Sequence, residues 1–151
     1  MQSATPSDTY ALVIGESLVD VVVDRTGGTV ERSGGSAANV AVALARLGRS
    51  VRFATAYADD ARGRMVVDHL AASGVEHASD PLVLDRTSSA VATIGEDGAA
   101  SYDFDLAWRV GEVDLATPPS FVHVCSLGAV VEPGARQVLA LLDRVGDAVV
   151  T

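Results

Sequence analysis

The sequence predicts an α/β fold, with a mostly parallel sheet flanked by helices and a small second sheet attached to it. Two observations carry this prediction. Short apolar runs alternate with amphipathic stretches in the first half of the chain, a pattern typical of parallel strands joined by crossover helices. Two pairs of extended segments surround glycine-containing turns, which predicts two β-hairpins.

The bulk composition is that of one globular domain. The chain has 151 residues, of which 48% are hydrophobic and 21% are charged, so it can bury a core. Its formal net charge of −9 disfavours nucleic acid and anionic membranes as partners, because both select basic surfaces. All 11 basic residues are arginine, and the absence of lysine excludes a Walker-type phosphate loop and a Schiff-base lysine.

Cysteine usage and the start of the chain predict a cytoplasmic protein. Cys125 is the only cysteine, so no internal disulfide forms, and we interpret it as a small buried residue on a strand. Residues 1–9 are polar and lack the features of a signal peptide, so we expect a flexible tail. No apolar run is long enough to span a bilayer.

The first strand and the first hairpin are expected directly after this tail. Residues 10–14 form a short apolar run that ends at a glycine, as buried strands do. Extended segments at 18–23 and 30–32 flank the turn-forming residues 26–29, which predicts a hairpin.

Two helices with a strand between them come next. A helix is expected at 37–47, a strand at 51–57 and a second helix at 61–73, capped by Asp59 or Asp60. Helical periodicity predicts these inward-facing residues: Val40, Leu44 and Leu47 in the first helix, and Val66 and Leu70 in the second.

The second half of the chain changes in character. Segments 88–95 and 99–105 surround an Asp-Gly pair, which is a strong hairpin signal. A buried strand is expected at 121–125, a third helix from Pro133 to about residue 145, and the start of another strand at 147–151.

The stretch from Gly34 to Asn39 is the strongest candidate for a binding site. Gly34 and Gly35 have no Cβ, and such a backbone can approach a ligand closely. The first N–H groups of the following helix point at the same space, and Asn39 offers donors and an acceptor that suit a vicinal diol. Read alone, Gly-Gly could merely form a tight strand-to-helix turn, and the spacing of Asp20 by itself favours a turn or cap residue. Asp20, Gly34, Gly35 and Asn39 taken together favour a binding site.

Three motifs resemble the PfkB (ribokinase-like) family of carbohydrate kinases. Gly34-Gly35-Ser36-Ala37-Ala38-Asn39 is similar to the family's N-terminal signature, and residues 13–20 resemble its first strand with a sugar-binding aspartate, here Asp20. Residues 58–63 resemble its Gly-Asp-Asp-x-Phe-Gly turn, but Ala58 and Arg62 replace a glycine and an aromatic residue. The resemblance begins at residue 10 and covers only the first half of such a kinase.

The resemblance implies a ribokinase-like fold, here truncated, whose hairpins at about 18–32 and 88–105 form a β lid over a sugar. Asp20, Gly34, Gly35 and Asn39 then hold the sugar. Tyr102 and Phe104 either cover it or fill the underside of the lid, and Ser126 forms a wall of the pocket. Residues 10–151 constitute the N-terminal part of one kinase domain, with a possible homodimer contact through the lid.

The implied reaction is ATP- and Mg²⁺-dependent phosphorylation of a sugar hydroxyl. Glu16, Ser126-Leu127-Gly128 and Glu132-Pro133-Gly134 are more similar to fructokinases than to ribokinases. The family's Gly-Ala-Gly-Asp motif, which supplies the catalytic base, is absent here, so we assign no catalytic residue and expect this fragment to be inactive. The alternative is a truncated, non-catalytic sugar-binding or interaction fragment. The histidines lack ligand spacing, so we expect no metal site.

Overall fold

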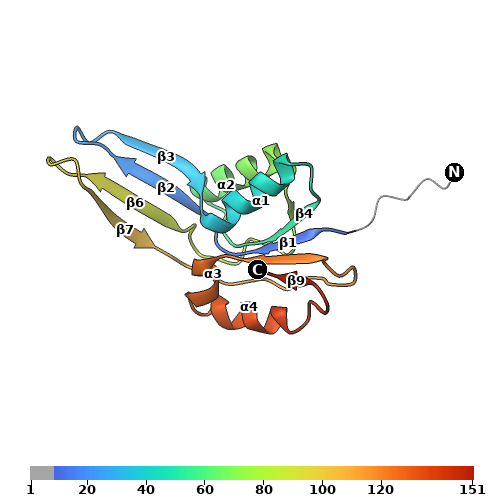
Figure 1. Ribbon diagram of the computed structural model, residues 1–151. Coiled ribbons are helices and arrows are strands. Elements are labelled where there is room, and N and C mark those ends of the chain that lie inside the picture. The colour runs from blue at the N-terminus through green and yellow to red at the C-terminus, as the bar shows by residue number, and fades with distance from the viewer. Residues whose placement is uncertain (1–8) are drawn as a thin grey trace.

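The computed structural model describes residues 9–151, and the tail predicted at 1–9 lies outside these residues except for Thr9. A parallel sheet lies between two layers of helices, and a second sheet projects from one end of it (Figure 1). None of the helices among the described residues has the length and apolar character that crossing a bilayer requires.

The parallel sheet has the strand order β5-β4-β1-β8-β9. β1 lies in its centre and pairs in parallel with β4 on one side and with β8 on the other. The strands predicted from apolar runs are present, although β4 is shorter than expected because the chain leaves the sheet after Ala54. The bounds of the five strands are β1 Ala11–Ile14, β4 Val51–Ala54, β5 Glu76–His77, β8 Phe121–Val124 and β9 Val149–Val150.

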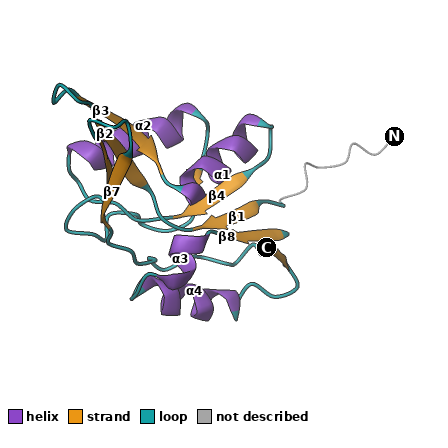
Figure 2. Cartoon of the chain, turned by 60° about the vertical axis from the view of Figure 1, so that its left-hand side comes forward, coloured by secondary structure: helices purple, strands orange, loops and turns teal. Residues whose placement is uncertain are grey.

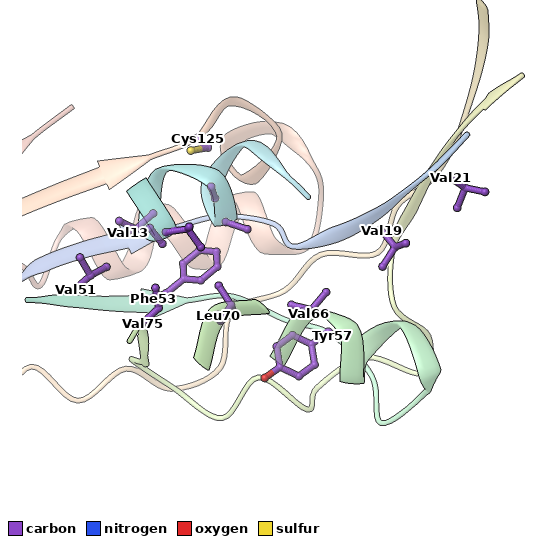
Figure 3. Close-up of a cluster of buried hydrophobic side chains, with 14 residues drawn as sticks. Val13, Val19, Val21, Val51, Phe53, Tyr57, Val66, Leu70, Val75 and Cys125 are labelled. Carbon is purple, nitrogen blue, oxygen red and sulfur yellow. The ribbon is translucent and has the colours of Figure 1, made fainter. Parts of the chain in front are cut away.

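Alternate residues of β1 supply the two faces of this sheet with a core each. Val13 packs on the side of α1 (Ser36–Arg46) and α2 (Ala61–Ala72), together with Phe53 and Leu70 (Figure 3). Leu12 and Ile14 pack in a second cluster with Val138 and Leu141 of α4 (Gly134–Leu142). This helix and α3 (Ser126–Val130) lie on the other side of the sheet (Figure 2). The central strand is therefore apolar on both faces, as in a doubly covered parallel sheet.

The prediction for the inward face of α1 was wrong at its end. Leu47 is 77% exposed and forms the C-cap, because the helix ends at Arg46 and the chain turns away at Gly48 with φ of +77°. Val40 and Leu44 pack only at the margin of the core. Small residues lie closest to the sheet and let the helix approach it: Ala37, Ala38, Ala41 and Val42.

The second half of the chain also departs from prediction in its helices. The short helix α3 was not expected, since its five residues carry neither a capping side chain nor a full amphipathic period. α4 begins one residue after Pro133 and ends at Leu142 instead of about residue 145. Val138 and Leu141 of this helix, and Val145 just beyond its end, are buried.

The N-terminus of α2 is tied to the second sheet through one carboxylate. Asp60 is the N-cap, and its Oδ1 accepts hydrogen bonds from Gly63 N (2.7 Å) and Thr87 Oγ1 (2.7 Å). Its Oδ2 accepts from Thr87 N at 2.9 Å, just before β6 begins. Burial tends to raise the pKa of Asp60, but these hydrogen bonds prevail and lower it.

We expect Asp60→Ala to lower the free energy of unfolding by about 2 kcal/mol, because it removes a helix cap and leaves Thr87 without its acceptor. Urea unfolding followed by the fluorescence of the buried Trp108 measures the loss. Since the pKa of Asp60 is lowered in the fold, its contribution is present above the usual aspartate pKa and is lost as the pH falls through the folded value. A difference between variant and parent that does not shrink on acidification would contradict this account.

The second sheet has the strand order β3-β2-β6-β7 and consists of the two predicted hairpins. β2 and β6 join the hairpins by parallel pairing. One face packs on α2 through Val19, Val21 and Val23, and the other carries Asp20 and Val22. The bounds are β2 Leu18–Val23, β3 Thr29–Gly34, β6 Ser89–Ile94 and β7 Ala100–Asp105. We call these four strands the lid sheet.

Candidate functional site

The candidate residues gather where the lid sheet meets the carboxyl ends of β1 and β8. Ile14 pairs with Val124 as the last residue of each strand, so Glu16 and Ser126 leave the parallel sheet at the same edge. Open α/β sheets bind ligands at this edge. The cavity of about 330 Å³ lined by Tyr10, Arg49 and Ser120 lies at the opposite, amino ends of the strands and contains none of the candidate residues.

Asp20 and Gly34 are in direct contact across β2 and β3. Leu18 pairs with Gly34, so Asp20 lies one diagonal step away on the same face. A Cβ on Gly34 would collide with the Asp20 carboxylate, which therefore occupies the space that the glycine leaves free. Within residues 9–151, the Asp20 carboxylate has no hydrogen-bond or ion-pair partner. It is an exposed acceptor that lies against Gly34 and is available to a ligand.

Gly35 is required by the fold itself. Its φ is +102°, a conformation that side chains other than glycine rarely adopt. A Cβ at this position would lie 2.8 Å from the carbonyl oxygen of Glu16 and 3.3 Å from the nitrogen of Leu18. The chain itself fills this space, so the structure explains Gly35 through close backbone packing. A role for Gly35 in binding sugar stays a prediction.

Asn39 and Ser126 are both exposed and come from different helices. Asn39 lies in the first turn of α1, and its backbone N–H donates to Gly35 O at 3.0 Å. The side-chain amide takes no part in this bond. Ser126 is the first residue of α3, directly after the buried Cys125. Cys125 is buried as expected, but it is the N-cap of α3 and lies one residue past β8 instead of on the strand. Its burial raises the pKa of the thiol.

The two lid aromatics lie on the same face of the lid sheet as Asp20. The pairing Asp20–Ala90–Phe104 places all three in one row, and Tyr102 lies in the next row. Phe104 is 54% exposed and Tyr102 is 65% exposed, and their rings stack with centroids 6.2 Å apart and planes 16° apart. These rings form an exposed platform about two strand spacings, or about 10 Å, from Asp20. Trp108 is instead buried in the core, where its Nε1 donates to Gly128 O at 2.9 Å.

Glu16 is the residue at this site to which we assigned no role from the sequence. It is only 3% exposed, and its Oε1 accepts hydrogen bonds from the backbone N–H and hydroxyl of Ser36, the first residue of α1. A carboxylate between Gly15 and Ser17 resembles a loop residue in the sequence. Only the packing of α1 against β1 reveals that it is buried.

The pKa of Asp20 predicts how ligand binding depends on pH. Although the residue as a whole is exposed, its neighbours partly cover the carboxyl group, and this burial raises its pKa above 3.8. The ionised form is an acceptor only, whereas the protonated form turns one oxygen into a donor and loses the charge that strengthens these hydrogen bonds. We therefore expect sugar affinity to fall on acidification, and to begin falling at a higher pH than it would with an aspartate of ordinary pKa. Calorimetric titration from about pH 7 to about pH 4 measures this. In Asp20→Asn this acid limb should be absent, and its persistence would assign the limb to another group.

Comparison with known proteins places most of this chain in one family. The family model described as "pfkB family carbohydrate kinase" matches residues 8–143. A fructokinase from Klebsiella pneumoniae is 30% identical over 142 residues, which cover 88% of this chain and 46% of that protein. Fructokinase-2 from Zea mays is 32% identical over 137 residues, covering 79% of this chain and 40% of that protein. The chain thus spans about half the length of the curated relatives it matches.

Solved structures give the same result for the fold. The crystal structure of a fructokinase from Xylella fastidiosa superposes with a TM-score of 0.79 at 27% identity, covering 93% of this chain and 49% of that one. A structure of that fructokinase with bound ATP has a TM-score of 0.73 over 93% of this chain and 47% of its own. A double mutant of the Vibrio cholerae fructokinase bound to fructose, ADP and potassium ion has a TM-score of 0.67 at 25% identity, covering 94% and 48%.

Proposed function

Because the chain belongs to the pfkB family of carbohydrate kinases, we propose that it is the sugar-binding half of an ATP-dependent kinase that phosphorylates a hydroxyl of fructose or a similar sugar. The observation that carries this proposal is the Asp20 carboxylate, which has no partner among residues 9–151 and lies against Gly34 where the lid sheet meets the carboxyl ends of β1 and β8. The named relatives favour fructose, and the free acceptor suits adjacent hydroxyls.

The described residues can bind and orient a sugar in three ways. Asp20 accepts hydrogen bonds from two neighbouring hydroxyls, and the Asn39 amide both donates and accepts. The stacked rings of Tyr102 and Phe104 offer an apolar surface to the C–H face of the sugar and shield it from water. Holding the acceptor hydroxyl in one orientation is a large part of what phosphoryl transfer needs, since that reaction depends on positioning and charge stabilisation.

ATP and Mg²⁺ are the proposed co-reactants. ATP donates the phosphoryl group in this proposal, which the ATP-bound fructokinase of similar fold supports. Among the described residues no cluster of three or more His, Cys, Asp or Glu side chains could hold a metal ion, so we assign no residue of this chain to Mg²⁺. The base that deprotonates the sugar hydroxyl is proposed to lie in a C-terminal half, and residues 1–151 alone are proposed to be inactive.

We further propose that the lid sheet can pair two copies of the protein. Its face that bears Asp20 continues outward as an exposed apolar strip, in which Val22 is 42% exposed and Val30 is 51% exposed. A contiguous apolar patch of this kind is typical of protein contacts. A cytoplasmic location is also proposed, since Cys125 is a free thiol in the structure and thiols stay reduced there.

The test combines fructose binding with turnover. Residues 1–151 are purified and titrated with fructose by calorimetry. ATP consumption is then assayed over a panel of sugars, both for residues 1–151 and for the longer protein that an extended reading frame would encode. We expect fructose-dependent turnover only from the extended protein, with light scattering reporting its association state. Turnover by residues 1–151 above a heat-killed control would contradict the assignment of the base to another half. An extended protein that neither binds nor phosphorylates any sugar would favour the alternative, a non-catalytic interaction fragment.

A further inference from the structure

We infer that Glu16 is a positioning residue, whose buried carboxylate holds the turn at Gly34–Ser36 against the strand that carries Asp20. This inference rests on the proposed function, because the geometry of this turn matters to a reaction only if the turn and Asp20 bind a sugar. Glu16 itself is buried, and we assign it no contact with the ligand.

The segment 16–20 touches the segment 34–36 at three successive points. At one end, the Asp20 carboxylate lies against Gly34. In the middle, the carbonyl oxygen of Glu16 lies 2.8 Å from the place that a Cβ of Gly35 would take. At the other end, Glu16 Oε1 accepts from Ser36 N at 3.0 Å and from Ser36 Oγ at 2.7 Å. Glu16 thus takes part in two of the three contacts, through its backbone and through its side chain.

The carboxylate of Glu16 takes the place of a helix cap that α1 lacks. The N-cap residue of α1 is Gly35, which has no side chain, and no side-chain cap of the usual kind is present. The acceptor comes instead from a residue 20 positions earlier in the chain. A carboxylate at a helix N-terminus is favoured by the partial positive charge there. A local Ser or Asp at the N-cap position would accept from the second or third amide of the helix instead, and it would not attach the helix to the segment that leads into β2.

The burial of the Glu16 carboxylate lowers the stability of the fold, as is common for residues that serve a functional site. Its Oε2 is buried and has no hydrogen-bond partner among residues 9–151, and an unpaired buried carboxylate oxygen is unfavourable. The backbone just before Glu16 is also tightly packed. A Cβ on Gly15 would lie 2.5 Å from Ala37 Cβ and 3.3 Å from Cys125 Cβ. Helix α1 is therefore pressed against the ends of β1 and β8, and Glu16 sets its first turn within that packing.

Amide hydrogen exchange in the unliganded chain, read by NMR, tests this role without activity. In Glu16→Ala we expect exchange at Ser36 and the following amides up to Asn39 to accelerate at least about tenfold beyond any change common to the chain. In Glu16→Gln the amide oxygen still accepts from Ser36, so exchange should stay within about threefold of the parent. Val138→Ala is the control, since it perturbs the opposite core cluster and should not single out residues 36–39.

Fructose titration of the same three variants connects the turn to ligand binding. We expect Glu16→Ala to weaken fructose binding by at least about tenfold, and Glu16→Gln and Val138→Ala to weaken it by less than about threefold. The inference is overturned if exchange at residues 36–39 in Glu16→Ala changes only as much as in Val138→Ala, or if Glu16→Gln loses protection as Glu16→Ala does. If the parent binds no fructose, the proposed function fails, while the exchange experiment still decides whether Glu16 positions the turn.

Discussion

Asp20→Ala should lower fructose affinity by about 30- to 150-fold, while the protein remains folded. The carboxylate has no partner among the described residues, so a bound sugar would gain charge-assisted hydrogen bonds that no other group at this position supplies. Losing such bonds costs about 2–3 kcal/mol, which corresponds to this range of affinity. Calorimetric titration with fructose measures the change, and turnover in an extended protein should fall with it.

Stability should not fall with affinity in this variant. Burial raises the pKa of Asp20, so the fold disfavours its ionised form, and removing the carboxylate at neutral pH relieves that penalty. We expect the unfolding midpoint of Asp20→Ala to equal or exceed that of the parent. Asp103→Ala is a matched control, because Asp103 is also an exposed aspartate of the lid sheet but pairs with Val91 and so lies on the opposite face. Equal affinity losses in the two variants would remove Asp20 from the binding site.

The parts of the fold that could be predicted are those encoded by local patterns. The apolar runs at 10–14 and 121–125 became β1 and β8, and the Asp97-Gly98 pair marked the turn between β6 and β7. Each of these signals depends on residues within about ten positions of one another. The short helix α3 carries no such signal, because its five residues are held by their place between β8 and α4.

The sequence could name candidate residues for the site, but it could not predict the contacts among them. The resemblance to PfkB kinases named Asp20 and Gly34, and the pairing of β2 with β3 then brought them together. The burial of Glu16 depends on α1 returning to the end of β1, and no local pattern around Gly15-Glu16-Ser17 predicts it. The sequence also predicted that both glycines leave space for a ligand. At Gly35 the backbone of Glu16 takes that space, and this contact between distant segments is not visible in a local pattern.

Gly35→Val should therefore act first on folding, because the backbone of Glu16 takes the space beside Gly35. The left-handed φ of +102° costs a β-branched residue about 1–3 kcal/mol. The collision with the carbonyl oxygen of Glu16 adds about 1–3 kcal/mol, because the backbone fixes the position of the new Cβ and the oxygen belongs to the backbone, so neither atom can rotate away. We expect the free energy of unfolding to fall by about 4 kcal/mol, measured by urea unfolding with Trp108 fluorescence.

Gly98→Val separates the two causes of this loss. Gly98 also has a left-handed φ, +81°, but a Cβ there would meet nothing within 4 Å, since the residue lies in the turn between β6 and β7. This variant should lose only the conformational part, about 1–3 kcal/mol. The difference between the two losses measures the backbone contact of Gly35 with Glu16. Equal losses of unfolding free energy in the two variants would show that this contact does not constrain the turn. Fructose binding by the Gly35→Val protein would then decide whether the glycine serves the ligand.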